Sequence, residues 1–223
     1  DAPQTLRDRI LSLLPAGVMA LVCAMLLFTP GVSVSAGTYD DGLAFFEKKD
    51  YAKALNHFQV IRRGLPGSNE SKQVLYLIGQ TYMSMQDHKN AVETFKASLA
   101  EYPEIEDYIL MDLARSWFNA GEYAHALEEV SRLLEKFPLS RLIPQAEMFR
   151  ADVLSQLAKN QTAVSFLKKV LEKYSKKPRD PDFAPYLPEL TFRLAVLLET
   201  ERQSKEAYSF YRELFINYPS HPL

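Results

Sequence analysis

Residues 79–103 of this 223-residue chain read GQTYMSMQDHKNAVETFKASLAEYP, and the spacing of four of them predicts the fold. Gly79 is followed twelve positions later by Ala91, Phe95 comes four after Ala91, and Pro103 comes twelve after it. Two antiparallel helices approach closely only where a side chain is small, so Gly79 and Ala91 mark the crossing of a helix pair. Pro103 ends the second helix, because proline disfavours helical geometry in the residue before it.

The same pattern recurs five times along the chain. Each copy has a small residue, an alanine twelve positions later, a third residue four after the alanine and a fourth residue twelve after the alanine. In this order the five copies are Gly42, Ala54, Phe58 and Pro66; Gly79, Ala91, Phe95 and Pro103; Ala114, Ala126, Val130 and Pro138; Ala151, Ala163, Leu167 and Ser175; and Ala195, Ala207, Tyr211 and Pro219. The alanines follow one another at 37, 35, 37 and 44 residues, whereas the inner spacing of twelve is constant. Added residues therefore fall between helix pairs.

This pattern resembles the tetratricopeptide repeat, a helix–turn–helix unit of about 34 residues that stacks into a solenoid. The resemblance covers Tyr39 to Pro219. It implies an all-α protein with a TPR-like α-solenoid of about five repeats over residues 37–223. The longest insertion, 175–188, is rich in proline, and we expect an exposed, stiff loop there. Thr38 and Asp41 have the spacing of a capping box that opens the first helix.

Residues 1–36 differ from the rest of the chain. Arg7 and Arg9 precede an uncharged stretch over 10–29, and Val34-Ser35-Ala36 places small residues where a signal peptidase cuts. This arrangement predicts a secretory signal peptide cleaved after Ala36. Its apolar run of 20 residues is also long enough to remain as an uncleaved anchor. In both cases the basic flank stays in the cytoplasm, so we expect a periplasmic protein that meets the membrane only through this segment.

Composition narrows the chemistry that the chain can carry. With 26 basic and 28 acidic residues the net charge is −2, which argues against a nucleic-acid partner, since such a protein needs a basic face. Cys23 is the only cysteine, so no internal disulfide framework or cysteine-rich zinc site is expected. The four histidines do not pair at helical spacing, and no glycine-rich phosphate loop or Gly-x-Ser-x-Gly elbow is present. We expect no metal, no cofactor and no catalytic site in this chain.

The first helix of each repeat supplies the concave face on which solenoids usually bind. Positions three before, one after and four after the small residue are expected to point there. The candidate groove residues are Tyr39, Phe46, Tyr76, Gln80, Met83, Met111, Arg115, Phe118, Met148, Asp152 and Phe192. An aromatic and methionine-rich groove suits an apolar helix, an extended peptide or a sugar ring. The alternative is that much of this surface packs against neighbouring repeats.

The last helical segment, over 204–218, has an apolar arc wider than one packing partner requires. Its members are Ala207, Tyr208, Phe210, Tyr211, Leu214, Phe215 and Tyr218. A solenoid needs a polar cap at each end. We therefore expect that the chain is a truncated piece of a longer protein, or that a partner covers this face.

For an exported solenoid, the repeat junctions are similar to the N-terminal helical region of soluble lytic murein transglycosylases. The similarity lies in residues 102–108, 137–140 and 187–222. It implies the non-catalytic scaffold of an enzyme that acts on peptidoglycan, beside a downstream catalytic domain. That family uses a catalytic Glu-Ser pair. We expect Glu70-Ser71 to lie in a polar loop after Pro66-Gly67, so the catalytic role is not assigned to Glu70. The alternative is a non-enzymatic cell-envelope adaptor, since similar repeats occur in an outer-membrane assembly lipoprotein and in the Tol–Pal coordinator.

Overall fold

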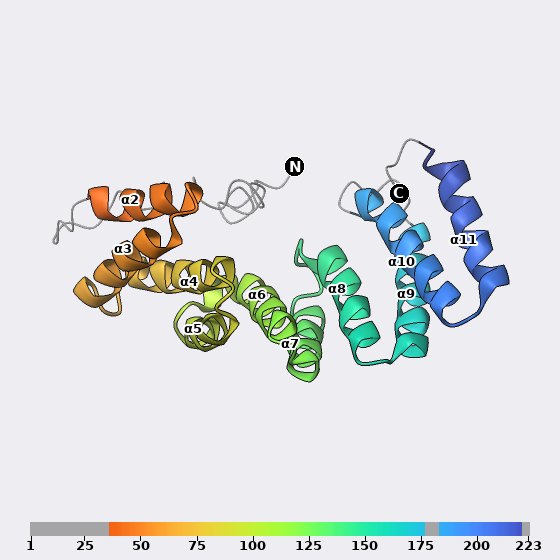
Figure 1. Ribbon diagram of the computed structural model, residues 1–223, viewed down its shortest axis with the longest axis horizontal. Helices are drawn as coiled ribbons and strands as arrows, with labels where there is room; N and C mark the ends of the chain where they lie inside the picture. The colour runs from red at the N-terminus through yellow and green to blue at the C-terminus, as the bar shows by residue number, and fades with distance from the viewer. Residues whose placement is uncertain (1–35, 177–182, 220–223) are drawn as a thin grey trace. The chain divides into compact units, whose positions relative to one another are not determined.

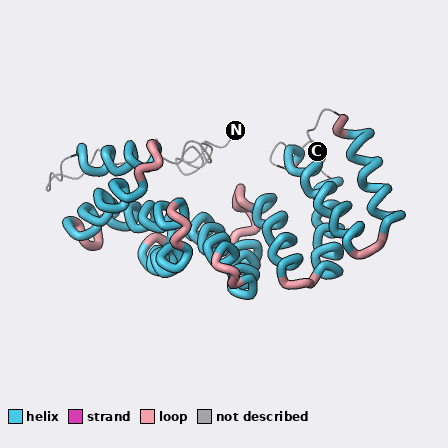
Figure 2. Tube along the Cα trace, in the orientation of Figure 1, coloured by secondary structure: helices cyan, strands magenta, loops and turns pink. Residues whose placement is uncertain are grey.

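The computed structural model describes residues 36–176 and 183–219, and this part of the chain folds into helices joined by short loops (Figure 1, Figure 2). It divides after Glu104 into two compact units. The first unit holds α2 (Ala36–Glu47), α3 (Tyr51–Gly64), α4 (Asn69–Ser84) and α5 (His88–Glu101). The second holds α6 (Glu106–Asn119), α7 (Tyr123–Lys136), α8 (Ile143–Gln156), α9 (Asn160–Ser175), α10 (Leu187–Thr200) and α11 (Ser204–Asn217). Short 3-10 helices lie at η2 (Pro103–Ile105) and η3 (Ala184–Tyr186).

The prediction of an all-α fold is confirmed, since the described residues contain no strand. None of the helices in the described ranges has both the length and the apolar character needed to cross a membrane. The predicted signal segment, 1–36, lies outside the described residues apart from Ala36.

Within the described ranges, the helices form five pairs in one register, α2 with α3, α4 with α5, α6 with α7, α8 with α9 and α10 with α11. Each first helix ends five residues after its small residue, as α4 does at Ser84, five after Gly79. Each second helix begins three residues before its alanine, as α5 does at His88, three before Ala91. The predicted constant inner spacing is therefore confirmed, and all variation in repeat length lies between the pairs.

The small residue permits the close crossing inside each pair. A Cβ atom added to Gly79 would lie 2.6 Å from Cε1 of Phe95, and one added to Gly42 would lie 2.7 Å from Cε1 of Phe58. Both phenylalanine rings are fully buried. In the second unit the corresponding pairs are Ala114 with Val130 and Ala151 with Leu167. In these two pairs the small residue gains a methyl group and its partner loses the aromatic ring, so the volume at the crossing is similar, whereas the fifth pair combines Ala195 with the partly buried Tyr211.

The turn inside each pair has one residue in the left-handed backbone conformation, always at the same position of the repeat. Five residues before each alanine the backbone φ is positive, between 55° and 82°, at Lys49, Gln86, Gly121, Ala158 and Arg202. The next residue donates its N–H to the carbonyl five positions back, as Asp87 does to Tyr82 over 2.9 Å. This is a Schellman motif, which satisfies the last carbonyls of the first helix. Only Gly121 has the residue type that signals it in the sequence.

The positions of the prolines determine where the second helices end. α3, α5, α7 and α11 end two residues before Pro66, Pro103, Pro138 and Pro219 respectively. α9 lacks the proline and runs two residues further, to Ser175. Proline cannot continue a helix and restricts the residue before it, which explains both observations.

Three local predictions are corrected. Glu70 and Ser71 lie in the first turn of α4 and not in a loop. α2 begins at Ala36, so Thr38 lies inside the helix and not at the N-cap position that a capping box requires. The predicted exposed loop over 175–188 is shorter than expected. Its first residue belongs to α9, Phe183 stacks on Tyr174 with ring centroids 4.5 Å apart, and Pro188 is buried in the first turn of α10. Residues 177–182 lie outside the described part.

Replacing Gly79 with alanine is expected to destabilise the first unit. The new methyl group meets the buried Phe95 ring, and overpacking of this kind costs about 1–3 kcal/mol. A further Phe95→Leu substitution makes room for the methyl group, so the double variant should lose less stability than the sum of the two single variants. Urea unfolding of all four proteins measures this coupling.

Gly64→Ala is the matched control, since a Cβ at Gly64 meets no atom within 4 Å. This substitution should leave the stability unchanged or raise it by up to about 1 kcal/mol, because alanine favours helix. Equal effects at Gly64 and Gly79 would contradict the crossing model.

Ala158→Gly is expected to stabilise the second unit by roughly 1 kcal/mol, because φ at this position is 55° and only glycine adopts it without a steric cost. Gly121→Ala should destabilise by a similar amount for the same reason. Ala97→Gly, at an exposed site within α5, is the control and should destabilise. A loss of stability in Ala158→Gly on thermal unfolding would overturn this account of the turn.

Candidate functional site

The predicted groove residues differ widely in their exposure. Tyr39, Tyr76 and Met111 are buried, and the tyrosine rings belong to the cores of their own helix pairs. The centroid of the Tyr76 ring lies 5.8 Å from that of Phe95, and Tyr39 lies 6.4 Å from Phe58. These three side chains therefore present little surface to a ligand, and their main role here is packing.

The residues four after the small residue are half-buried over the turns. Phe46 meets the edge of Tyr51 at 5.5 Å between ring centroids, and Phe118 meets Tyr123 in the same way at 5.2 Å. Tyr51 and Tyr123 are each the first residue of the second helix in their pair. These aromatic side chains thus pack the second helix against the first, and only part of each ring faces solvent.

The remaining predicted groove residues fall into two sets, one in each unit. In the first unit, Gln80 of α4 is half-buried and donates a hydrogen bond from Nε2 to the hydroxyl of Tyr76 over 2.9 Å. Met83, one turn further along α4, is also half-buried. In the second unit, two of the predicted residues, Phe118 and Asp152, contact the next first helix through residues that were not predicted.

We define the α6–α8–α10 surface by Arg115, Phe118, Met148, Phe149, Asp152, Glu189, Phe192 and Arg193. Phe118 of α6 meets the ring of Phe149 of α8 in a T-shaped contact, with centroids 5.3 Å apart. Asp152 of α8 pairs with Arg193 of α10. Three successive first helices are therefore linked by their side chains into one continuous surface.

The charged residues of this surface form two groups. The Arg193 guanidinium pairs with Asp152 and also donates from Nε to Glu189 over 2.9 Å. Arg115 pairs with the buried Asp112, with 3.6 Å between Nη1 and Oδ1. The side chains of Arg115, Asp152 and Arg193 remain 41%, 40% and 30% exposed, so their charges can reach a partner.

The environment of Asp152 shifts its pKa. Burial disfavours the charged carboxylate and raises the pKa above its ordinary value, whereas the Arg193 guanidinium opposes that rise. Sequence reasoning found Asp152 but missed Arg193 and Glu189. Their spacing of four residues on one helix is a signal that could have indicated an ion pair, but not its contact with α8.

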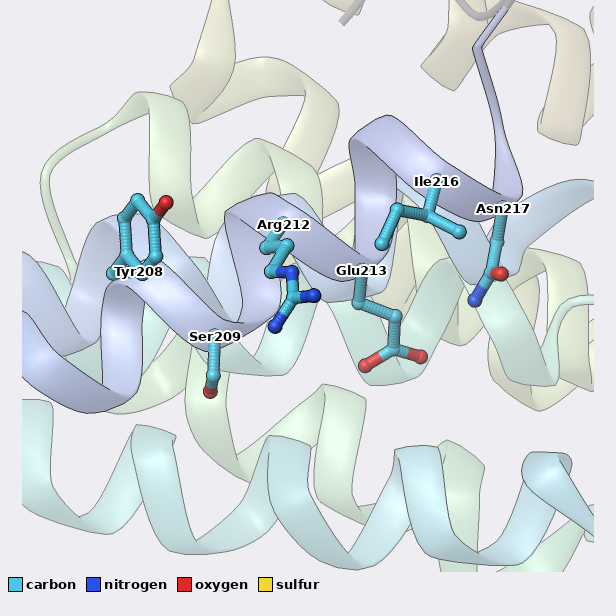
Figure 3. A pocket seen from close by; sticks show the side chains of 6 residues that line it. All are labelled: Tyr208, Ser209, Arg212, Glu213, Ile216 and Asn217. Carbon is cyan, nitrogen blue, oxygen red and sulfur yellow. The ribbon is translucent and has the colours of Figure 1, made fainter.

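A shallow depression lies on α11, lined by Tyr208, Ser209, Arg212, Glu213, Ile216 and Asn217 (Figure 3). All six side chains come from one helix, so the depression has no opposite wall that could enclose a small molecule. It is one side of an open helix face. Among the described residues, no group of three or more His, Cys, Asp or Glu side chains is arranged to hold a metal ion.

Comparisons with known proteins agree with this architecture. A family model described as "Tetratricopeptide repeat" matches residues 72–105, which span most of α4 and α5. The apo form of RapI superposes with a TM-score of 0.71 at 16% identity, covering 83% of this chain and 54% of that one. A tetratricopeptide repeat protein from Parabacteroides merdae ATCC 43184 gives 0.66 at 18% identity, with 82% and 66% covered.

A third solved structure, MamA from Desulfovibrio magneticus RS-1, gives a TM-score of 0.66 at 12% identity and covers 83% of this chain and 96% of that one. No curated protein matches the sequence. At these identities the structural likeness establishes the fold alone. The fold is thus a helical repeat fold of the tetratricopeptide type, and one stretch of the chain, residues 72–105, matches the tetratricopeptide repeat family model.

Substituting Arg193 with methionine should raise the pKa of Asp152 further, because the cation that favours its carboxylate is removed. A raised pKa means that the folded state holds the proton more tightly than the unfolded state. This carboxyl therefore stabilises the fold most at pH below its unfolded pKa, and the contribution is lost as the pH rises through the folded pKa. Carboxyl NMR titration measures the shift directly.

Arg115→Met is the control, since Arg115 pairs with Asp112 and not with Asp152. It should leave the Asp152 titration unchanged. A fall in the Asp152 pKa in Arg193→Met would contradict the arrangement described for this surface.

Proposed function

We propose that this chain is an exported scaffold that binds a protein partner through the α6–α8–α10 surface. The observation that carries the proposal is the Asp152–Arg193–Glu189 group, which joins α8 to α10 and leaves its charges partly exposed. A surface that spans three repeats offers an extended partner several contacts at once. Tetratricopeptide repeats generally serve in partner binding, which supports this role.

The chemistry of the surface defines the partner that fits it. Half-buried apolar side chains, Phe118, Met148 and Phe192 among them, lie beside the charged groups. On this surface the guanidinium groups of Arg115 and Arg193 balance the carboxylates of Asp152 and Glu189, so both signs of charge are present. A helix or extended peptide that alternates apolar residues with charged residues of both signs complements such a surface.

The narrower function of a lytic murein transglycosylase scaffold rests on the resemblance of the repeat junctions. In the structure, Tyr102 and Phe137 are the C-cap residues of α5 and α7, with N–H groups that donate to the carbonyls of Ser98 and Leu133. Helix termination alone accounts for these residues, so they favour an enzyme scaffold no more than an envelope adaptor. Measuring the binding of the purified chain to peptidoglycan, beside the capture of a protein partner, separates the two roles.

Export is proposed from the sequence of residues 1–36. The basic flank, the apolar run and the small residues before Gly37 are its support. The scaffold would then act in the periplasm, anchored if the segment is not cleaved.

A photo-crosslinking amino acid placed at Arg115 is expected to capture a protein partner in cells, because this side chain is exposed on the α6–α8–α10 surface. The same probe at Glu128, exposed on α7, is the control and should capture none. Binding of the purified chain to peptidoglycan without any protein crosslink at Arg115 would favour the transglycosylase scaffold and contradict the proposed partner.

Charge exchange in the double variant Asp152→Arg with Arg193→Asp tests whether the partner recognises these charges. The ion pair between positions 152 and 193 is retained with its polarity reversed. The pair between position 193 and Glu189 is lost, but a pair of this kind on a helix contributes only about 0.3–0.5 kcal/mol, so the fold should be preserved, whereas binding of the captured partner should weaken at least about tenfold. Isothermal titration calorimetry compares the affinities. Full affinity in the double variant would show that the pair serves structure alone.

Fusion of residues 1–60 to a phosphatase that is active only after export should give an active reporter, since a signal segment directs its passenger across the membrane. A fusion lacking residues 1–36 is the control and should be inactive. Mass spectrometry of the exported product is expected to show Gly37 as the first residue. Activity in the control fusion, or none in the full fusion, would overturn the proposal of export.

A further inference from the structure

Arg150 on α8 is a charged residue at a position that other repeats fill with a buried apolar one. It comes one residue before the small residue of its pair, where α4, α6 and α10 have Ile78, Leu113 and Leu194, all buried. In the first described pair the position is Asp41, which is exposed on α2. Packing of the repeat therefore does not require an arginine here, since leucine fits the same position of the helices on either side.

The Arg150 side chain carries its charge without a counter-charge. Three other half-buried arginines, Arg62, Arg115 and Arg193, each pair with a carboxylate. Arg150 is also half-buried, but it forms no ion pair with a carboxylate in the described ranges, and its Nε is buried without an acceptor there. Because a guanidinium stays protonated in proteins, it cannot avoid the free-energy cost of this environment by losing its proton.

The carboxylates nearest to Arg150 in the sequence are engaged in other contacts. Glu147 lies three residues before it, a spacing at which two residues can pair, but it accepts hydrogen bonds from Lys173 and Tyr174 of α9. Asp152, two residues after Arg150, pairs with a residue of α10. The described part of the fold thus uses both carboxylates elsewhere and leaves the Arg150 charge available to a further group.

The ring of Phe166 on α9 orients the guanidinium. The Cζ atom of Arg150 lies 4.7 Å from the centroid of this ring, a cation–π contact. The ring covers one face of the planar group and Nε is buried, so a ligand has to meet the two Nη groups. These groups donate side by side, which is the geometry that binds both oxygens of a carboxylate.

Two polar residues of α9 extend this site. Thr162 and Lys169 lie four residues before and three after Phe166, so they share its side of the helix, and both are exposed. The adjacent Lys168 pairs with a carboxylate of α11, whereas Lys169 forms no ion pair with a described residue. Beside Arg150, the site therefore offers a second cation and a hydroxyl group.

We propose that Arg150, Thr162, Phe166 and Lys169 form a binding site for an acidic segment of a partner protein. Arg150 binds one carboxylate through its Nη groups, and Lys169 binds an adjacent one. A phosphate fits less well, because phosphate sites commonly use free backbone N–H groups at a helix N-terminus, whereas Arg150 and Phe166 lie inside their helices. This site shares no residue with the α6–α8–α10 surface and does not depend on the function proposed for that surface.

The acidic residues Asp180 and Asp182 of the chain itself lie outside the described part. The described residues end at Lys176 and resume at Phe183, whose ring stacks on Tyr174. Tyr174 comes eight residues after Phe166, about 12 Å further along α9. Both ends of the segment 177–182 are thus held away from the Arg150 site, which favours a carboxylate supplied by another molecule.

The test uses a fluorescein-labelled hexaglutamate peptide as the acidic segment. Fluorescence anisotropy is expected to show saturable binding to the full chain. Arg150→Leu should weaken this binding at least about tenfold, because the bidentate contact is lost. Arg150→Lys keeps the charge but not the paired donors, so it should weaken binding less than Arg150→Leu does. Arg63→Leu, at an exposed position of α3, removes the same charge and should bind as the unaltered chain does.

Thermal unfolding separates a binding residue from a structural one. Arg150→Leu is expected to unfold at a temperature equal to or above that of the unaltered chain, because leucine fits this position in α6 and α10 and leaves no unpaired charge. A lower unfolding temperature would make the contact with Phe166 a structural one and overturn the proposal.

Binding measurements can overturn the proposal in three further ways. One is the absence of saturable binding, and another is equal binding by Arg150→Leu and the unaltered chain, which would place the peptide elsewhere. The third is displacement of the peptide by inorganic phosphate at a lower concentration than by the dicarboxylate succinate, which would make phosphate the ligand.

A last variant tests whether the chain supplies the carboxylate itself. The double variant Asp180→Asn with Asp182→Asn should bind the peptide with unchanged affinity, because neither residue competes for the Arg150 site. Tighter binding by this variant would show that the segment 177–182 occupies the site, and so contradict a partner protein.

Discussion

The structure depends on one close contact, the crossing of two helices at a residue with a small side chain or none. At Gly79 the backbone of α4 lies so near the buried ring of Phe95 that a single added carbon would overlap it. This proximity fixes both the distance and the register of the pair, since a shift of one residue along either helix would place a larger side chain at the crossing. The turn has only to connect two ends that the crossing has already positioned.

The fixed register explains why the turns tolerate unfavourable backbone conformations. Four non-glycine residues hold a positive φ in the turns of the five pairs, Lys49, Gln86, Ala158 and Arg202. Each costs free energy locally, and the packed crossing on one side and the Schellman hydrogen bonds on the other offset that cost. Between the pairs no such constraint acts, and the chain varies there, as in the two extra residues of α9.

The same register determines which side chains are left for binding. Residues three before the small residue, such as Tyr76 and Met111, are drawn into the repeat cores, so the surface of the first helices is more polar than its sequence suggests. The side chains that reach solvent on α8 and α10 include an ion-paired group around Arg193. On α11 the register leaves apolar side chains exposed, because their positions are built to meet another helix.

The sequence by itself determined the helix pairs, their constant inner spacing and the proline-terminated ends, because each follows from local preferences and from small residues at fixed intervals. It also identified Arg115 and Asp152 as surface residues. Only the tertiary structure decided which groove residues are buried, because burial of Tyr39 depends on a ring sixteen residues after Gly42 and not on its own neighbours. The pairing of Asp152 with Arg193, 41 residues apart, likewise arises only when α8 and α10 are brought together.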